Sequence, residues 1–271
     1  MATDPLSVPL IVEPDPDYPD CATILVDGVI AGLPHRFVLD TGTARTHVTA
    51  DDYTSTLPSH AQHQATGVFA SCGQDLVMLP SVSLGPVTIP DLEVTRAPSS
   101  RSLLGMDVLG SVALRFDFLR AELSMAASGS FPTRWPLERS PGGHPFIDVV
   151  WPGTTGRACW DSGAGITVVD RGFLTEHSDL FQPIGTATGT DSTGTQVETE
   201  LYVMAEARAG DAILAPTTVA AADLPRTNGR MDLTLGYPAL CQADWVLDFP
   251  ANRWSATPSQ TADMALRDRA G

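Results

Sequence analysis

Two short motifs in this sequence place a carboxylate where it could act as an acid or a base. Asp40 stands in Asp-Thr-Gly, and Asp161 stands in Asp-Ser-Gly 121 residues further along the chain. Each follows an apolar run, Phe37–Leu39 in the first case and Cys159–Trp160 in the second. Two carboxylates that meet in one cleft repel each other when both are charged, so they share a proton and offer one acid and one base. Such a pair can deprotonate a water molecule and protonate the oxygen of the group that the water attacks.

The residues that follow each aspartate would support the pair. Gly42 and Gly163 would let the backbone turn sharply and approach its twin closely. The hydroxyls of Thr41 and Ser162 can each form a hydrogen bond to the other loop. We therefore expect two loops that hold each other together.

The two loops differ at the next position. Thr43 can hydrogen-bond the Asp40 carboxylate, which would favour the charged form of that group. The corresponding residue is Ala164, which has no polar side-chain atom. We therefore expect an unequal pair in which Asp40 holds its charge more easily than Asp161.

The motifs belong to an internal repeat that organises the chain. A second shared block contains Leu-Leu-Gly ending at Gly105 and Thr-Leu-Gly ending at Gly236, 131 residues apart. The difference between the two offsets predicts ten additional residues in the second copy. We expect them within Asp211–Gly229, where Ala, Thr, Pro and Asn-Gly cluster.

Between these blocks lies one glycine-bounded segment in each half, Thr66–Gly73 and Thr188–Gly194, and each predicts a hairpin. Short apolar runs rich in Val, Thr, Ile and Phe dominate elsewhere. The expected architecture is all-β, with two related six-stranded barrel lobes and a cleft between them. The only helix candidates are Ala50–Leu57, Val108–Val112 and Arg171–His177.

The expected division is an N-terminal extension 1–18, lobe one 19–128, a linker 129–143, lobe two 144–256 and a tail 257–271, with the extension and the tail loose.

Composition limits what the chain can bind. Its formal net charge is −16, from 16 basic and 32 acidic residues, whereas nucleic acid recognition needs a basic surface. No stretch is apolar and long enough to span a membrane, and we expect no signal peptide. The four cysteines form no CxxC motif, which favours a cytoplasmic location. The six histidines lack zinc-binding spacing, so we expect no metal and no cofactor.

The segments from Phe37 to Thr43 and from Cys159 to Ala164, with their downstream Gly105 and Gly236, resemble the two signatures of aspartic peptidases. The lobes are short, as in retropepsins, but fused in one chain, as in pepsins. The resemblance implies a monomeric pseudo-dimer with one active site, an Asp40/Asp161 dyad and a peptide or small molecule as substrate. It also implies hairpins that cover the cleft. The candidate substrate-binding residues on them are Phe69, Ser71, Cys72 and Gly73 in the first half and Asp191, Ser192 and Thr193 in the second.

Some features depart from the pepsin pattern. Neither hairpin has the tyrosine that pepsin-like enzymes carry there, and Phe69 is at best a partial replacement. We also expect no pro-segment long enough for a zymogen. An endopeptidase is the leading interpretation. Two alternatives remain: a non-proteolytic acid/base enzyme for small-molecule cyclisation, dehydration or hydrolysis, as in secondary metabolism, and a catalytically silent binding module.

Overall fold

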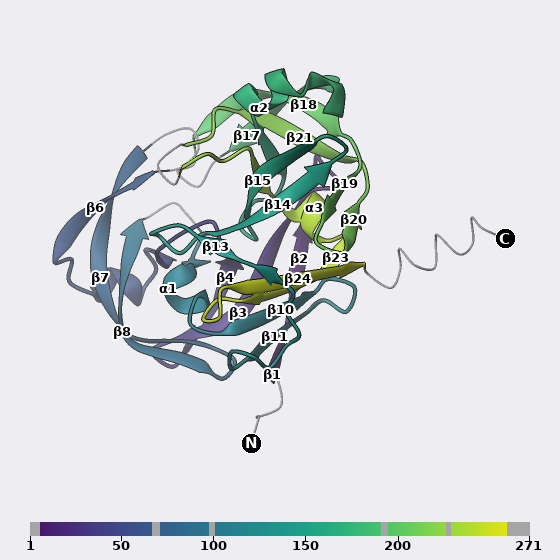
Figure 1. Ribbon diagram of the computed structural model, residues 1–271. Helices are drawn as coiled ribbons and strands as arrows, with labels where there is room; N and C mark the ends of the chain where they lie inside the picture. Colours follow the sequence, from purple (N-terminus) through teal and green to yellow (C-terminus); the bar gives the residue numbers. More distant parts are fainter. Residues whose placement is uncertain (1–5, 67–70, 98–100, 191–194, 226–228, 259–271) are drawn as a thin grey trace.

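A computed structural model of the chain describes residues 6–66, 71–97, 101–190, 195–225 and 229–258 (Figure 1). Strands make up 57% of the described residues, and the helices among them are short. The prediction of an all-β protein is confirmed. The described strands form three sheets, of eight, ten and six strands.

The eight-stranded sheet is built from the first half of the chain, in the order β2-β3-β4-β9-β5-β8-β7-β6, and β3 also pairs with β7. Its strands are β2 (Ile11–Pro14), β3 (Ala22–Ile30), β4 (Leu33–Leu39), β5 (His47–Thr49), β6 (Ala61–Thr66), β7 (Ser71–Leu84), β8 (Val87–Ala97) and β9 (Leu103–Leu104).

The ten-stranded sheet is built from the second half, in the order β17-β18-β21-β16-β22-β15-β14-β19-β20, with β13 paired to β14. Its strands are β13 (Glu138–Arg139), β14 (Pro145–Trp151), β15 (Thr154–Trp160), β16 (Thr167–Asp170), β17 (Phe181–Thr190), β18 (Gln196–Met204), β19 (Ala207–Ala209), β20 (Ala212–Leu214), β21 (Thr217–Ala222) and β22 (Leu233–Leu235).

These two sheets share one connection pattern around the aspartates. In the first half, β4 is parallel to β9, and β9 is antiparallel to β5. In the second half, β15 is parallel to β22, and β22 is antiparallel to β16. Each Asp-containing loop therefore leaves one strand, passes the central short strand and enters the strand on its other side. The repeat found in the sequence is a repeat of structure.

The six-stranded sheet takes strands from both halves, in the order β1-β11-β10-β23-β24-β12. These strands are β1 (Leu6–Pro9), β10 (Ala113–Asp117), β11 (Glu122–Ala126), β12 (Trp135–Pro136), β23 (Ala243–Asp248) and β24 (Arg253–Pro258). Leu114 lies opposite Leu247, and Phe116 lies opposite Trp245. The repeat equates Leu114 with Trp245 and Phe116 with Leu247, so β10 and β23 pair about a local two-fold axis.

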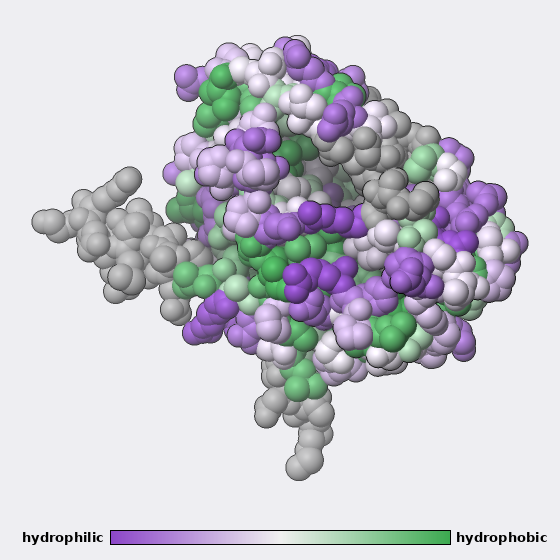
Figure 2. Space-filling view, turned by 180° about the vertical axis from the view of Figure 1, so that it is seen from behind, coloured by the Kyte–Doolittle hydropathy of each residue, from purple (hydrophilic) through white to green (hydrophobic). Residues whose placement is uncertain are grey.

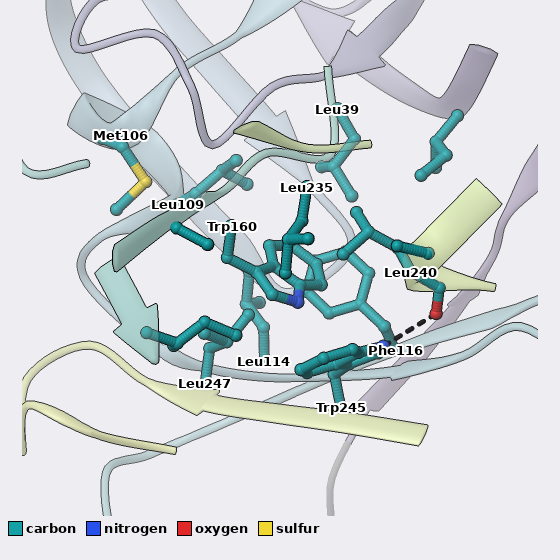
Figure 3. Close-up of a cluster of buried hydrophobic side chains, with 14 of the residues drawn as sticks. Leu39, Met106, Leu109, Leu114, Phe116, Trp160, Leu235, Leu240, Trp245 and Leu247 are labelled. Atoms are coloured by element: carbon teal, nitrogen blue, oxygen red, sulfur yellow. Dashed lines mark hydrogen bonds between the residues drawn. The ribbon is translucent and has the colours of Figure 1, made fainter. Parts of the chain in front are cut away.

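The apolar side chains above this sheet form a core to which both halves contribute (Figure 3). Trp160 is fully buried, with its ring 4.7 Å from that of Phe116 and 5.8 Å from that of Trp245, measured between centroids. The indole N–H of Trp245 donates to the carbonyl of Leu240 at 2.7 Å. Burying large aromatic rings supplies much of the hydrophobic stabilisation of a domain. Trp160 therefore points away from the loop of Asp161 and into the core, as its position in the strand predicts.

The described residues include three short α-helices, α1 (Met106–Leu109), α2 (Arg171–Glu176) and α3 (Tyr237–Leu240). Helix α2 matches the prediction at Arg171–His177, and the Asp170 carboxylate caps it by accepting from two backbone N–H groups. The candidate Ala50–Leu57 contains only a 3-10 turn, Thr54–Thr56. Helix α1 begins before the predicted Val108, and α3 was not predicted.

The structure has strands in two segments for which the sequence indicated none, and it divides the ten additional residues. The stretch 1–18, expected to be loose, holds β1 and β2, which pair with β11 and β3. The expected linker 129–143 holds β12 and β13. The ten additional residues are not in one place, because strand β17 is four residues longer than its counterpart β6, and the connection from β21 to β22 is five residues longer than that from β8 to β9.

Candidate active site

The two aspartates occupy matching positions at the ends of matching strands. Asp40 directly follows β4, and its backbone N–H donates to the carbonyl of Leu104 at 3.0 Å. Asp161 directly follows β15, and its backbone N–H donates to the carbonyl of Leu235, also at 3.0 Å. Each carboxylate therefore projects from a backbone that the neighbouring strand β9 or β22 holds in place.

The glycines of the two motifs bring the carboxyls together. A Cβ atom at Gly42 would lie well inside van der Waals contact with the carboxyl group of Asp161. A Cβ atom at Gly163 would collide in the same way with the carboxyl group of Asp40. The backbone N–H of Gly42 donates to Asp40 Oδ1 at 2.9 Å, and that of Gly163 donates to Asp161 Oδ1 at 2.8 Å. Each carboxyl thus lies between the glycine of its own loop and the glycine of the opposite loop.

The two hydroxyls after the aspartates link the loops. The backbone N–H of Thr41 donates to Ser162 Oγ at 3.1 Å, and the backbone N–H of Ser162 donates to Thr41 Oγ1 at 3.1 Å. The Thr41 hydroxyl also donates to the carbonyl of Trp160 at 2.8 Å. Both side chains are buried, so these hydrogen bonds are shielded from competition by water.

Burial and mutual repulsion hold protons on this pair. Burial raises the pKa of the Asp40 carboxyl well above its usual range, and the charge of Asp161 raises it further. Burial also raises the pKa of Asp161, while the backbone N–H groups of Gly163, Ala164 and Gly42 oppose the rise. Two neighbouring acids with raised pKa values are the condition under which one stays protonated while the other is ionised.

The asymmetry of the pair differs from the expectation based on Thr43. The hydroxyl of Thr43 donates to the carbonyl of Arg45 at 3.4 Å, and it is the backbone N–H of Thr43 that supports Asp40. Ala164 supports Asp161 in the same way, through its backbone N–H. The side chains at these two positions therefore do not distinguish the carboxyls. Asp161 receives more backbone N–H groups than Asp40, which favours the negative charge on Asp161 and the proton on Asp40.

Sequence reasoning missed a second support, a threonine six residues after each aspartate. Thr46 Oγ1 accepts from the backbone N–H of Gly105 at 3.1 Å, and Thr167 Oγ1 accepts from that of Gly236 at 3.1 Å. Asp107 then accepts from the backbone N–H of Thr46 at 2.8 Å and from its hydroxyl at 2.6 Å. The signal was present in the sequence, because both threonines recur at the 121-residue offset of the aspartates.

Both predicted hairpins exist, although their tips lie outside the described residues. The first consists of β6 and β7, paired from Ala61–Leu76 to Thr66–Ser71, and the second consists of β17 and β18. Of the candidate substrate-binding residues, Cys72 is half-buried and Gly73 is exposed, both on β7, and Ser71 begins that strand. Phe69, Asp191, Ser192 and Thr193 lie outside the described residues. Figure 2 shows that the molecule is hollowed on the face opposite to that of Figure 1.

Cys159 does not serve as a nucleophile in this arrangement. Its side chain is buried, and burial, with the charges of Asp161 and Asp40, raises the pKa of the thiol well above its usual range. A neutral buried thiol packs like a small apolar group.

Across the described ranges, no three His, Cys, Asp or Glu side chains are grouped to hold a metal ion. Within the same ranges, no helix has the length and apolar character needed to cross a membrane.

A comparison with protein families matches residues 26–108 to the aspartyl protease family. The matched segment contains Asp40, its supporting loop and the Leu-Leu-Gly block. Over this segment, 83 of the 271 residues, the chain is similar to aspartyl proteases. A search of curated proteins finds no match.

Proposed function

We propose that this protein is an aspartic endopeptidase that uses Asp40 and Asp161 to activate a water molecule against a peptide carbonyl. The observation that carries the proposal is the interlocking of two Asp-(Thr/Ser)-Gly loops, which puts each carboxyl against the glycine of the other loop. The family match over residues 26–108 supports the same reading.

The chemistry follows from the shared proton. Ionised Asp161 accepts a proton from the water, and the resulting hydroxyl attacks the carbonyl carbon of the substrate. Protonated Asp40 donates its proton to the carbonyl oxygen, so the tetrahedral intermediate forms without a separated charge. When the C–N bond breaks, Asp161 gives its proton to the nitrogen, and one hydroxyl of the tetrahedral intermediate returns a proton to Asp40, so the dyad again holds one proton. The products are a carboxylic acid, which contains the carbonyl oxygen and the oxygen of the water, and a free amine.

We further propose that the two halves act as two lobes of one monomer, with the substrate held between them. The local two-fold pairing of β10 with β23 and the exchange of hydrogen bonds between Thr41 and Ser162 support this arrangement. Since each half supplies one carboxyl, neither half alone can carry out the reaction.

Cleavage of a peptide library from about pH 3 to about pH 7 tests the function, with and without a pepstatin-type inhibitor. We expect cleavage by the wild-type chain, inhibition by pepstatin and loss of at least about a hundredfold in kcat/KM for Asp40→Asn and Asp161→Asn. Asp148→Asn removes an exposed carboxylate from β14 and is the matched control. Equal cleavage by the wild type and Asp40→Asn would refute the proposal. If no peptide is cleaved, the dyad acts on a different class of substrate.

A further inference from the structure

A row of side chains lies under the first hairpin, on the face of β7 that turns toward the body of the protein. Alternate residues of a strand share a face, so Cys72, Gln74 and Leu76 point the same way. Leu76 pairs with Thr95 on β8, and Thr95 pairs with His47 on β5. Gln74 is 9% exposed and His47 is 4% exposed, so both polar side chains are buried beneath the hairpin.

Hydrogen bonds connect these side chains into one continuous network. His47 Nδ1 and Thr95 Oγ1 are 3.1 Å apart, and a further hydrogen bond joins the side chains of His47 and Gln74. Gln74 Nε2 donates to Cys72 Sγ at 3.8 Å. Burial lowers the pKa of His47 to about 4, against the opposing effect of Gln74, so the ring is neutral above that pH. A neutral ring has one acceptor and one donor, which accommodates Thr95 on one side and Gln74 on the other.

His47 also marks the end of the loop that carries Asp40. It is the first residue of β5, and the preceding Thr46 is fixed by its two hydrogen bonds to Asp107. This network of hydrogen bonds therefore joins the β6–β7 hairpin to the loop that positions the Asp40 carboxyl.

At the position that corresponds to His47, the described part of the second half has an apolar residue. Val168 occupies the position of His47, since it pairs with Ala220 and Thr234 as His47 pairs with Thr95 and Leu103. A valine cannot form a side-chain hydrogen bond. On β18, Thr199 donates to the carbonyl of Ala187 within its own hairpin at 3.3 Å.

We propose that His47 is a positioning residue that docks the β6–β7 hairpin onto the Asp40 loop through its hydrogen bond to Gln74. The role in positioning substrate rests on the proposed function, whereas the docking itself does not. The repeat supplies a contrast at this position, because His47 can form this hydrogen bond and Val168, which corresponds to it in the second half, cannot.

Hydrogen exchange of the intact protein without substrate tests the docking. We expect Gln74→Met and His47→Phe each to speed exchange of the amides in Ala61–Thr66 and in residues 72–76 by roughly fivefold, the ratio for one net hydrogen bond. Exchange in β17 and β18 should stay the same. His47→Gln keeps one donor and one acceptor, so it should restore much of the protection. The control Thr199→Val should leave the first hairpin unchanged.

Peptide cleavage then separates positioning from simple loss of structure. We expect Gln74→Met to raise KM severalfold and to change kcat by no more than about twofold, since the dyad is untouched. Loss of folded protein would instead lower kcat at constant KM. Unchanged exchange in both Gln74→Met and His47→Phe overturns the proposal even if the wild type is an active peptidase. Faster exchange confined to the first hairpin supports the docking even if no peptide is cleaved, and in that outcome only the proposed function fails.

Discussion

At the scale of single residues, the site depends on the absence of a side chain at Gly42 and Gly163 as much as on the two carboxyls. The Asp40 carboxyl occupies the space that a Cβ at Gly163 would fill, and the Asp161 carboxyl occupies the space next to Gly42. A strained backbone is not the reason for glycine here, because neither residue has a positive φ. The glycines are needed because two chains and two carboxyls converge in one small volume.

We expect Gly42→Ala and Gly163→Ala to push the opposite carboxyl out of place. Overpacking of this kind costs about 1–3 kcal/mol of stability, and a displacement of about 1 Å at reacting groups can lower kcat/KM by about a hundredfold. Urea unfolding and peptide cleavage measure the two effects. Gly153→Asn is the control, since Gly153 has φ +87° with open space around it and Asn tolerates that conformation. Full activity in both alanine variants would contradict the geometry.

The raised pKa values of the pair predict how stability depends on pH. The folded protein binds more protons than the unfolded chain above the ordinary Asp pKa of about 3.9, so stability falls as pH rises from there through the raised values. We expect Asp40→Asn and Asp161→Asn to remove this loss. Their Tm should exceed that of the wild type near pH 7, and the difference should shrink toward pH 3. A gap that widens at acid pH would contradict the raised values.

At the scale of elements, the loops after β4 and β15 stabilise each other by exchanging hydrogen bonds. Thr41 uses its hydroxyl both as acceptor from the Ser162 N–H and as donor to the Trp160 carbonyl. Because Thr41 is fully buried, water cannot replace it. The loops are therefore coupled through two backbone groups that a single hydroxyl satisfies.

We expect Thr41→Val to leave those two groups unpaired and to cost about 1–3 kcal/mol, measured by urea unfolding. Activity should fall as well, since the second loop loses a contact beside Asp161. Thr41→Ser retains the hydroxyl and is the matched control, which should stay near wild-type stability. If valine and serine behave alike, the hydrogen bonds across the two loops contribute nothing to stability.

The sequence predicted the elements whose signals are local. The Asp-containing loops, the hairpins and α2 each have motif, glycine or capping residues within a few positions. Strands β1 and β2 were missed because their pairing depends on distant partners: Leu6 lies opposite Met125, and nothing near Leu6 indicates that contact. The role of Thr43 was misjudged for a similar reason, because a side-chain pattern does not show that its backbone N–H faces the carboxyl.

At the scale of the whole molecule, the six-stranded sheet joins the two halves closely. The two halves share one hydrophobic core, although a linker separates them in the sequence. Strands β10 and β23 pair along their length, and β1, β11, β24 and β12 extend the sheet on both sides (Figure 1). Trp160, from the ten-stranded sheet, packs on Phe116 from the first half and Trp245 from the second. Separating the halves would expose these rings and leave two strand edges unpaired.

We therefore expect the chain to unfold in one cooperative transition, and the separate segments 1–128 and 129–271 not to fold alone. Chemical denaturation followed by tryptophan fluorescence and by far-UV circular dichroism should give coincident curves. Segment 129–271 contains Trp160 and Trp245 but lacks Phe116 and β10, so its fluorescence should report exposed indoles until segment 1–128 is added. Reassembly of the two segments should restore the fluorescence typical of buried indoles. It should also bring Asp40 and Asp161 together again. Two separate transitions, or a stable segment 129–271, would show that each half has an independent core, because only then could it bury these rings without its partner.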